Sequence, residues 1–193
     1  MAIEIKAMSP DLTESFFHFF DKVAFADNPD WSGCYCCYYQ LDCSNEKWNM
    51  LTKEQNRFTA EQNIRKGKVS GYLAFENNVP VAWVNVNARS SLPRLKVIDK
   101  IAFFKSHGEA ASVVCFVVSF LYRGKGLARK LLRHAIADCT RKGFDSLEAY
   151  PRLGENLTPA DQFHGPLQLY LSEGFDLVKE YETMAIVQRK LKG

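Results

Sequence analysis

The sequence predicts a single mixed α/β domain over residues 1–193. Its length of 193 residues supports one well-formed hydrophobic core and does not require a second domain. Hydrophobic residues at 47% and charged residues at 24% are typical of a soluble globular protein. Strand-like and helix-like patterns are mixed along the chain, without an internal repeat, a low-complexity segment or a linker, which favours one α/β unit.

The N-terminal part predicts a strand, a helix and an aromatic segment. Residues 2–7 alternate apolar and charged side chains, which is typical of a half-buried strand. Ser9, Pro10 and Asp11 are typical of a helix start, and a phenylalanine-rich core face follows until Asp27-Asn28-Pro29. Residues 31–41, WSGCYCCYYQL, predict extended structure, and we expect residues 31–39 of this segment to line a pocket.

The remaining elements follow from periodicity and from turn residues. We expect helices over residues 46–50 and 52–66, an antiparallel hairpin of strands 69–75 and 79–87, and a short helix or loop over 90–108. A buried strand over 112–119 precedes an amphipathic helix that ends at Gly143. We then expect a strand over 146–150, a loop over 151–162, a short helix between Gly165 and Gly174, and strands over 175–181 and 183–190.

Charge and hydropathy limit the partners of the chain. A net charge of +3 and a pI near 8.5 are too weakly basic for a nucleic-acid-binding surface, but they suit a small anionic ligand. The N-terminus lacks a basic segment followed by an apolar one, and the longest apolar run, residues 110–121, is too short to span a bilayer as a helix. We therefore expect a cytoplasmic protein that binds neither nucleic acid nor membrane.

The six cysteines are expected to be free thiols. Cys34, Cys36, Cys37 and Cys43 lie close together, but their spacing lacks the two separated C-x-x-C pairs of a structural zinc site. The sequence therefore predicts buried or pocket-lining thiols and no metal.

A glycine-rich turn joins the predicted central strand to its amphipathic helix. Arg129 occupies the third glycine position of the dinucleotide fingerprint G-x-G-x-x-G, and the P-loop lysine and hydroxyl pattern is missing, so both readings fail. The backbone N–H groups at a helix N-terminus are unpaired and carry partial positive charge. Because Gly124 and Gly126 have no Cβ, this turn predicts a site for a pyrophosphate.

The same turn resembles the signature of the GNAT superfamily of N-acetyltransferases, Arg or Gln, two residues, Gly, one residue, and Gly or Ala. Arg123, Gly126 and Ala128 fill these positions directly after a strand. The resemblance implies the GNAT fold, a mostly antiparallel twisted sheet that is splayed at the acetyl-CoA site and flanked by helices. It also implies acetyl-CoA as co-substrate, with pyrophosphate contacts from Arg123, Gly124, Lys125, Gly126, Leu127 and Ala128 and pantetheine contacts from the backbone of Val117 and Val118.

A second resemblance lies in residues 169–175, LYLSEGF, which are similar to the L-Y-x-x-x-G-F element of the same superfamily. It implies that Tyr170 is the general acid that protonates the departing thiolate. The superfamily commonly has an asparagine seven residues before this tyrosine, where this chain has Phe163. The usual asparagine contact to the coenzyme is therefore not carried over.

The base that accepts the proton of the attacking amine is the most open assignment. Glu148, on the strand after the coenzyme helix, is our candidate, with Glu109, Asp27 and Asp30 as alternatives. Cysteine chemistry is the other option, but no histidine is fixed near a cysteine by the sequence. We expect direct transfer in a ternary complex.

The leading hypothesis is an acetyl-CoA-dependent N-acetyltransferase acting on a primary amine of a small molecule or peptide. A non-catalytic acyl-CoA-binding or sensing module is the alternative, because it would keep the same turn. The sequence leaves open the acceptor, the length of the acyl group and the oligomeric state, a homodimer included.

Overall fold

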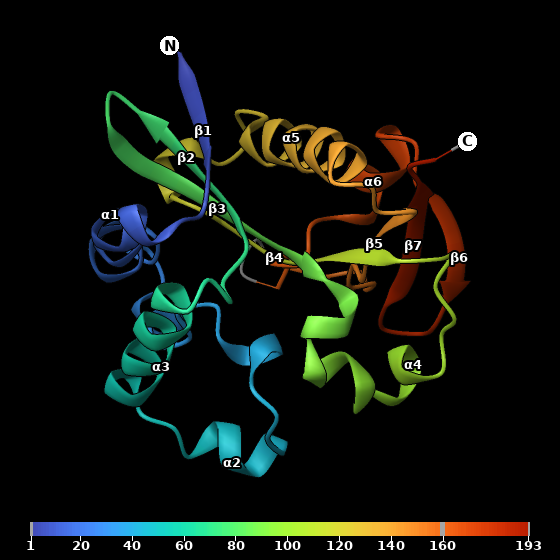
Figure 1. Ribbon diagram of the computed structural model, residues 1–193, viewed down its shortest axis with the longest axis horizontal. Coiled ribbons are helices and arrows are strands. Elements are labelled where there is room, and N and C mark those ends of the chain that lie inside the picture. Colours follow the sequence, from blue (N-terminus) through green and yellow to red (C-terminus); the bar gives the residue numbers. More distant parts are fainter. Residues whose placement is uncertain (1, 159–160, 193) are drawn as a thin grey trace.

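A computed structural model describes residues 2–158 and 161–192, which form one mixed sheet with helices on both faces (Figure 1). The strands are β1 (Ile3–Ala7), β2 (Gly71–Glu76), β3 (Val79–Ala88), β4 (Ala110–Val118), β5 (Ser146–Ala149), β6 (Asp176–Glu180) and β7 (Ala185–Lys190), in the spatial order β1-β2-β3-β4-β5-β7-β6. Every neighbouring pair is antiparallel except β4 and β5, which are parallel. The predicted mixed fold with a mostly antiparallel sheet is confirmed.

Helices cover the two faces of this sheet. They are α1 (Thr13–His18), α2 (Asn45–Asn49), α3 (Lys53–Arg65), α4 (Asp99–Ala102), α5 (Leu127–Arg141) and α6 (Leu167–Ser172). Figure 1 shows α5 and α6 on one side of the sheet and α1 and α3 on the other. Within the described residues, no helix has the length and apolar character needed to cross a membrane.

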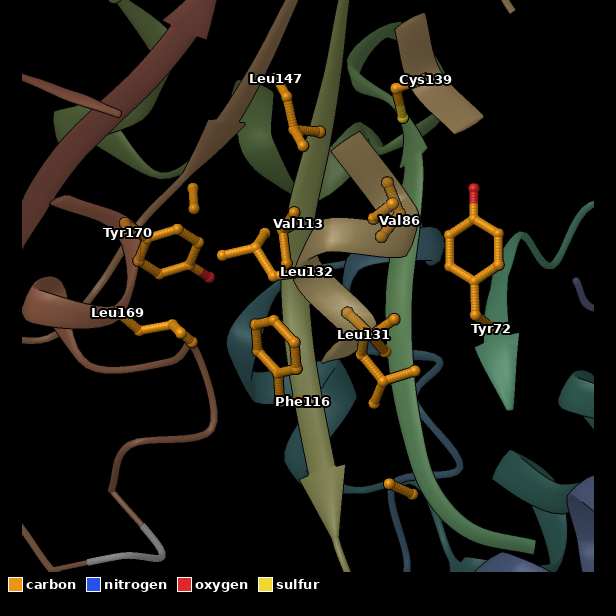
Figure 2. Close-up of a cluster of buried hydrophobic side chains, with 14 of the residues drawn as sticks. Tyr72, Val86, Val113, Phe116, Leu131, Leu132, Cys139, Leu147, Leu169 and Tyr170 are labelled. Atoms are coloured by element: carbon orange, nitrogen blue, oxygen red, sulfur yellow. The ribbon is translucent and has the colours of Figure 1, made fainter. Parts of the chain in front are cut away.

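The long amphipathic helix α5 packs its apolar face on the centre of the sheet. Leu131 and Leu132 are fully buried there and share a cluster with Val113 and Phe116 of β4 (Figure 2). Basic side chains such as Arg133 lie on its outer surface. This packing fixes the N-terminus of α5 beside the C-terminal end of β4, where the glycine-rich turn lies.

The opposite face is covered by the phenylalanine-rich stripe that follows β1. Phe16 and Phe20 are buried in a cluster with Trp83 of β3, and the Phe16 and Trp83 ring centroids are 5.2 Å apart at an angle near perpendicular. Edge-to-face contacts of this kind stabilise aromatic cores. The predicted role of the stripe as core is confirmed, although a π-helical turn, Phe19–Val23, extends α1.

Strands β4 and β5 separate part of the way along their length. Their pairing extends only from Ala110 opposite Ser146 to Val113 opposite Ala149, while β4 continues to Val118. Beyond this point the backbone N–H of Phe116 donates to the carbonyl of Phe163, at 2.6 Å, in a loop. The two strands therefore open into the splay that the resemblance implies.

A bulge in β4 sets which side chains face this opening. Cys115 pairs with Asn85 and Val113 pairs with Val86, so Val114 is an extra residue in β4. An extra residue shifts the alternation of side chains by one. Phe116 therefore joins the cluster under α5, while Cys115 faces the opposite side.

The prediction of extended structure over residues 31–41 is wrong. This segment consists of turns, with 3-10 turns at Pro29–Trp31 and Tyr38–Gln40. Tyr35 and Cys36 have positive φ angles of 41° and 53°. Aromatic composition favours strands only where a neighbouring strand is available for pairing, and these residues instead bury their side chains from turns. The prediction for the 151–162 loop includes Pro159 and Ala160, which lie outside the described residues.

Candidate active site

A cavity of about 1050 Å³ follows the C-terminal half of β4. Its lining runs from the glycine-rich turn after β4, past Val118 and Phe116, to Cys115 and the turns of residues 31–39. We call residues 123–129 the coenzyme end and the part around Trp31, Tyr39 and Phe163 the acceptor end. The volume is at the upper limit of ordinary ligand sites, roughly 300–1,000 Å³, and is large enough for two substrates.

The coenzyme end presents bare backbone. Gly124 and Gly126 have positive φ angles of 72° and 76°, and a Cβ added at either position would meet no heavy atom within 4 Å. Gly126 is the N-cap of α5 and offers no side-chain acceptor to the first N–H groups of the helix. An anion can therefore approach these N–H groups closely, and the residues of the turn fit the pyrophosphate of the coenzyme.

Arg123 holds the turn in place. Its Nε donates to the carbonyl of Val118 at 3.0 Å, and its guanidinium forms an ion pair with Asp27 from the segment after α1. Arg123 therefore positions the turn. The Asp27 carboxylate, an alternative candidate for the base, is already paired with this guanidinium.

Five other residues are predicted to contact the coenzyme, and the cavity lining includes four of them. Val117, Val118, Leu127 and Ala128 line the cavity, and their contacts with the coenzyme stay a prediction. Lys125 does not belong to the lining, and its ammonium instead lies 5.5 Å from the ring centroid of Tyr122.

Tyr170 lies behind the cavity wall. Its side chain is fully buried in the cluster under α5 (Figure 2). Its hydroxyl donates to the backbone carbonyl of His164. Burial raises the pKa of this hydroxyl well above its usual value. Leu169 and His164 belong to the lining, whereas Tyr170 does not. To protonate a thiolate in the cavity, Tyr170 would have to exchange its present acceptor.

Glu148 is also buried and lies on β5, outside the lining. Its two carboxylate oxygens accept hydrogen bonds from Tyr150 and Gln188, each at 3.0 Å, and Arg89 forms an ion pair with it at 3.3 Å. These contacts satisfy the carboxylate inside the sheet. Glu148 therefore does not reach the cavity in this structure, and its role as base stays a prediction.

The structure adds a polar pair that the sequence did not reveal. Tyr39 and His164, 125 residues apart, are joined between the Tyr39 hydroxyl and His164 Nε2 at 3.1 Å, and both line the cavity. Burial, assisted by the charge of Arg152, lowers the pKa of His164 to about 3. The imidazole is therefore neutral near pH 7. Nothing local in the sequence connects these two residues.

Three cysteines, Cys34, Cys36 and Cys115, line the same part of the cavity. Asn85 Nδ2 lies 3.3 Å from the Cys36 sulfur. The Cys115 and Asn85 hydrogen bonds lower the pKa of Cys36 against the opposing effect of burial, while burial and the charge of Cys36 raise that of Cys34 to about 12.

The predicted location of these thiols in a pocket wall is seen for Cys34 and Cys36, whereas Cys37 is buried away from the lining. All six cysteines are free. Across residues 2–158 and 161–192, no cluster of three or more His, Cys, Asp or Glu side chains could hold a metal ion.

A splayed sheet with a bare helix N-terminus at the end of its central strand agrees with one family. The family model for the acetyltransferase (GNAT) family matches residues 11–164. The chain belongs to the GNAT family. It is therefore an N-acetyltransferase by family, while its acceptor is not fixed by the match. No curated protein sequence matches the chain significantly.

Solved GNAT structures have the same fold at low sequence identity. An N-acetyltransferase from Staphylococcus aureus Mu50 is 14% identical with a TM-score of 0.58, and the match covers 100% of both chains. The PaiA N-acetyltransferase from Thermoplasma acidophilum, in complex with coenzyme A, is 15% identical with a TM-score of 0.57, covering 98% of this chain and 99% of that one. The ribosomal-protein-S18-alanine N-acetyltransferase from Escherichia coli is 14% identical with a TM-score of 0.54, covering 100% and 96%. These identities support the fold alone.

Proposed function

We propose that this GNAT protein transfers an acetyl group from acetyl-CoA to a primary amine by direct attack in a ternary complex. The supporting observation is that one cavity runs along β4 from the bare N-terminus of α5 to the acceptor end. Both substrates can therefore be bound at once, with the thioester beside the strand between them. We further propose that residues 1–193 act as one acetyltransferase domain, because a single sheet includes strands from Ile3 to Lys190.

The coenzyme would be held mainly by backbone groups. The N–H groups of Gly126, Leu127 and Ala128 suit the pyrophosphate, while the edge of β4 near Val117 and Val118 suits the pantetheine arm. In the family, acetyl-CoA supplies the activated acetyl group, and one solved relative in fold contains coenzyme A. Backbone N–H groups near Val118 would polarise the thioester carbonyl as the amine attacks.

Tyr170 remains our proposed proton donor to the coenzyme thiolate. Its hydroxyl lies one hydrogen bond from the backbone of His164, which lines the cavity, so a small movement of the 163–165 loop would bring it to the wall. Glu148 stays the candidate for the base, and it would have to exchange at least one of the three partners of its carboxylate to accept a proton from the amine.

The experiment is a free-thiol-release assay with acetyl-CoA and grouped amines, alongside a calorimetric titration of the protein with coenzyme A. Amine-dependent thiol release with saturable coenzyme binding is the expected result. Coenzyme binding without thiol release for any amine would instead favour the acyl-CoA-sensing alternative. The panel includes short peptides, because one relative in fold is named for acetylating a ribosomal protein.

A further inference from the structure

The acceptor end of the cavity is walled by aromatic rings in continuous contact. Ring centroids are 5.8 Å apart for Trp31 and Phe163, 5.8 Å for His164 and Tyr39, and 5.2 Å for Tyr38 and Trp48. All six residues line the cavity, and we call them the aromatic wall: Trp31, Tyr38, Tyr39, Trp48, Phe163 and His164. A surface of this kind suits a flat aromatic ligand, since stacked and edge-to-face rings attract each other beyond their burial.

Aromatic rings can also attract a cation, but this wall already carries its own. The Arg152 guanidinium lies 5.4 Å from the ring centroid of Phe163, and that of Arg94 lies 4.3 Å from Tyr38. Arg94 is 2% exposed and donates to the Cys43 carbonyl and the Asn45 side chain. At Phe163 and Tyr38, a substrate cation would therefore compete with a protein cation for the same ring.

The charges lining the cavity also disfavour a cationic acceptor. Among the described residues, Asp27 is the only acidic side chain in the lining, and it is paired with Arg123. Arg129 and Arg152 add further positive charge. Such a cavity offers no unpaired carboxylate to a polyamine or a lysine-rich peptide.

Arg152 is placed to bind an anionic group at the edge of the aromatic wall. It lines the cavity and pairs with Asp161 at 3.3 Å, with side chains 46% and 33% exposed. A pair so exposed contributes little by itself, so a ligand carboxylate can join or replace Asp161 at the guanidinium. The ring of the same ligand would lie against Phe163 and Trp31.

We propose that the acceptor is an amine that carries both an aromatic ring and a carboxylate, with its ring on the aromatic wall and its carboxylate on Arg152. This inference rests on the proposed function and names its substrate class. In the transfer, the neutral amine forms the new C–N bond and the C–S bond of acetyl-CoA breaks. The amine loses one proton and the coenzyme thiolate gains one, so the products are the N-acetyl compound and free coenzyme A.

The test compares phenylalanine with phenethylamine, which has the same ring and amino group but no carboxylate, and with spermidine. We expect phenylalanine to exceed phenethylamine in kcat/KM by about threefold to fivefold, because a carboxylate contact with a guanidinium that stays partly exposed contributes modestly. Spermidine should be the poorest acceptor. Equal or better turnover of phenethylamine or spermidine would overturn the proposal.

Two arginine variants test whether the carboxylate of the ligand binds Arg152. Arg152→Gln should reduce the preference for phenylalanine over phenethylamine to about one, and it should leave coenzyme affinity unchanged. The matched control is Arg57→Gln, since Arg57 also stacks on a ring, at 4.1 Å from Phe17, and also pairs with an aspartate, Asp21, but lines a different cavity. A preference that survives in Arg152→Gln, or that is lost equally in Arg57→Gln, counts against the proposal.

Replacing part of the aromatic wall tests the ring. Trp31→Ala should raise KM for phenylalanine several-fold, whereas Phe103→Ala removes a ring that is 87% exposed outside the cavity and should change nothing. Direct titration of the coenzyme-loaded protein with phenylalanine separates the two hypotheses. Binding of phenylalanine without thiol release would contradict the proposed function alone, whereas amine-dependent thiol release without discrimination for aromatic acids would contradict this inference alone.

Discussion

The two ends of the cavity are built in different ways. The coenzyme end consists of consecutive residues, 123–129, whose positive φ glycines and helix start create the site from local backbone. The acceptor end takes its rings from residues 31 to 48 and 163 to 164, which meet only in the folded chain. We propose that the backbone of the first end binds the coenzyme that the family shares, while the side chains of the second end select the acceptor.

The two ends of the cavity also depend on packing in different ways. The coenzyme end needs α5 to be seated on the sheet, and the contacts we propose for it come mainly from backbone groups. The acceptor end depends on contacts such as Tyr39 with His164 and Phe163 with Trp31. Point substitutions should therefore affect the coenzyme end through backbone and charge, and the acceptor end through lost side chains.

The largest effect is expected for Gly126→Glu. The new carboxylate would occupy the open space above the helix start and repel the pyrophosphate, so coenzyme affinity should fall on the order of 1,000-fold as two or three charged hydrogen bonds are lost. Calorimetric titration with coenzyme A measures it. Gly67→Glu is the control, because Gly67 has a φ of 65° and equally open surroundings at the end of α3. Retained affinity in Gly126→Glu would remove the turn from the coenzyme site.

A smaller effect, about 100-fold in kcat, is expected for Tyr170→Phe if this hydroxyl protonates the thiolate. Coenzyme affinity should be unchanged, since the ring remains in place. Tyr72→Phe is the control, because Tyr72 is also buried under α5 and its hydroxyl also makes a buried hydrogen bond, to Asp138 at 2.5 Å. Equal loss of kcat in the two variants would show a structural effect only.

The buried imidazole of His164, at the acceptor end, should make the stability of the protein depend on pH. Burial and Arg152 lower its pKa from 6.5 to about 3 in the folded chain, so between these values the unfolded chain binds a proton that the folded chain does not. This contribution to stability is present above pH 6.5 and is lost as the pH falls towards 3, at about 1.4 kcal/mol per pH unit at most.

Chemical denaturation across that range measures this dependence. His164→Gln should have a flatter pH profile than the wild type, while His18→Gln, an exposed change on α1, should not. Parallel profiles for wild type and His164→Gln would contradict a neutral buried imidazole.

The smallest effect is expected for Asp27→Asn. It weakens the ion pair that ties Arg123 to the segment after α1, but the Arg123 bond to the Val118 carbonyl remains. Because partly exposed ion pairs contribute up to about 1 kcal/mol, KM for acetyl-CoA should rise by no more than about fivefold. Asp30→Asn, in the same loop, is the control, and a loss comparable to that of Gly126→Glu would mean that Asp27 contacts a substrate directly.

Much of the fold was predictable because its signals are local. Thr52 and Gln55 form the capping box that starts α3, and Asn77 and Asn78 adopt the positive φ of the hairpin turn. The segment of residues 31–41 could not be predicted in the same way. Its aromatic residues favour a strand by composition, but contacts with distant rings such as Phe17 and Phe163 hold it in turns.

The sequence by itself determined the coenzyme end, since a strand, two glycines and a helix start are encoded in consecutive residues and their chemistry is that of the backbone. Only the tertiary structure decided the acceptor end. It joined Tyr39 to His164, brought Arg152 to Phe163, and buried Glu148 and Tyr170 outside the cavity lining. The physical reason is that these contacts depend on the bulge and splay of β4, which are set by packing between elements far apart in the chain.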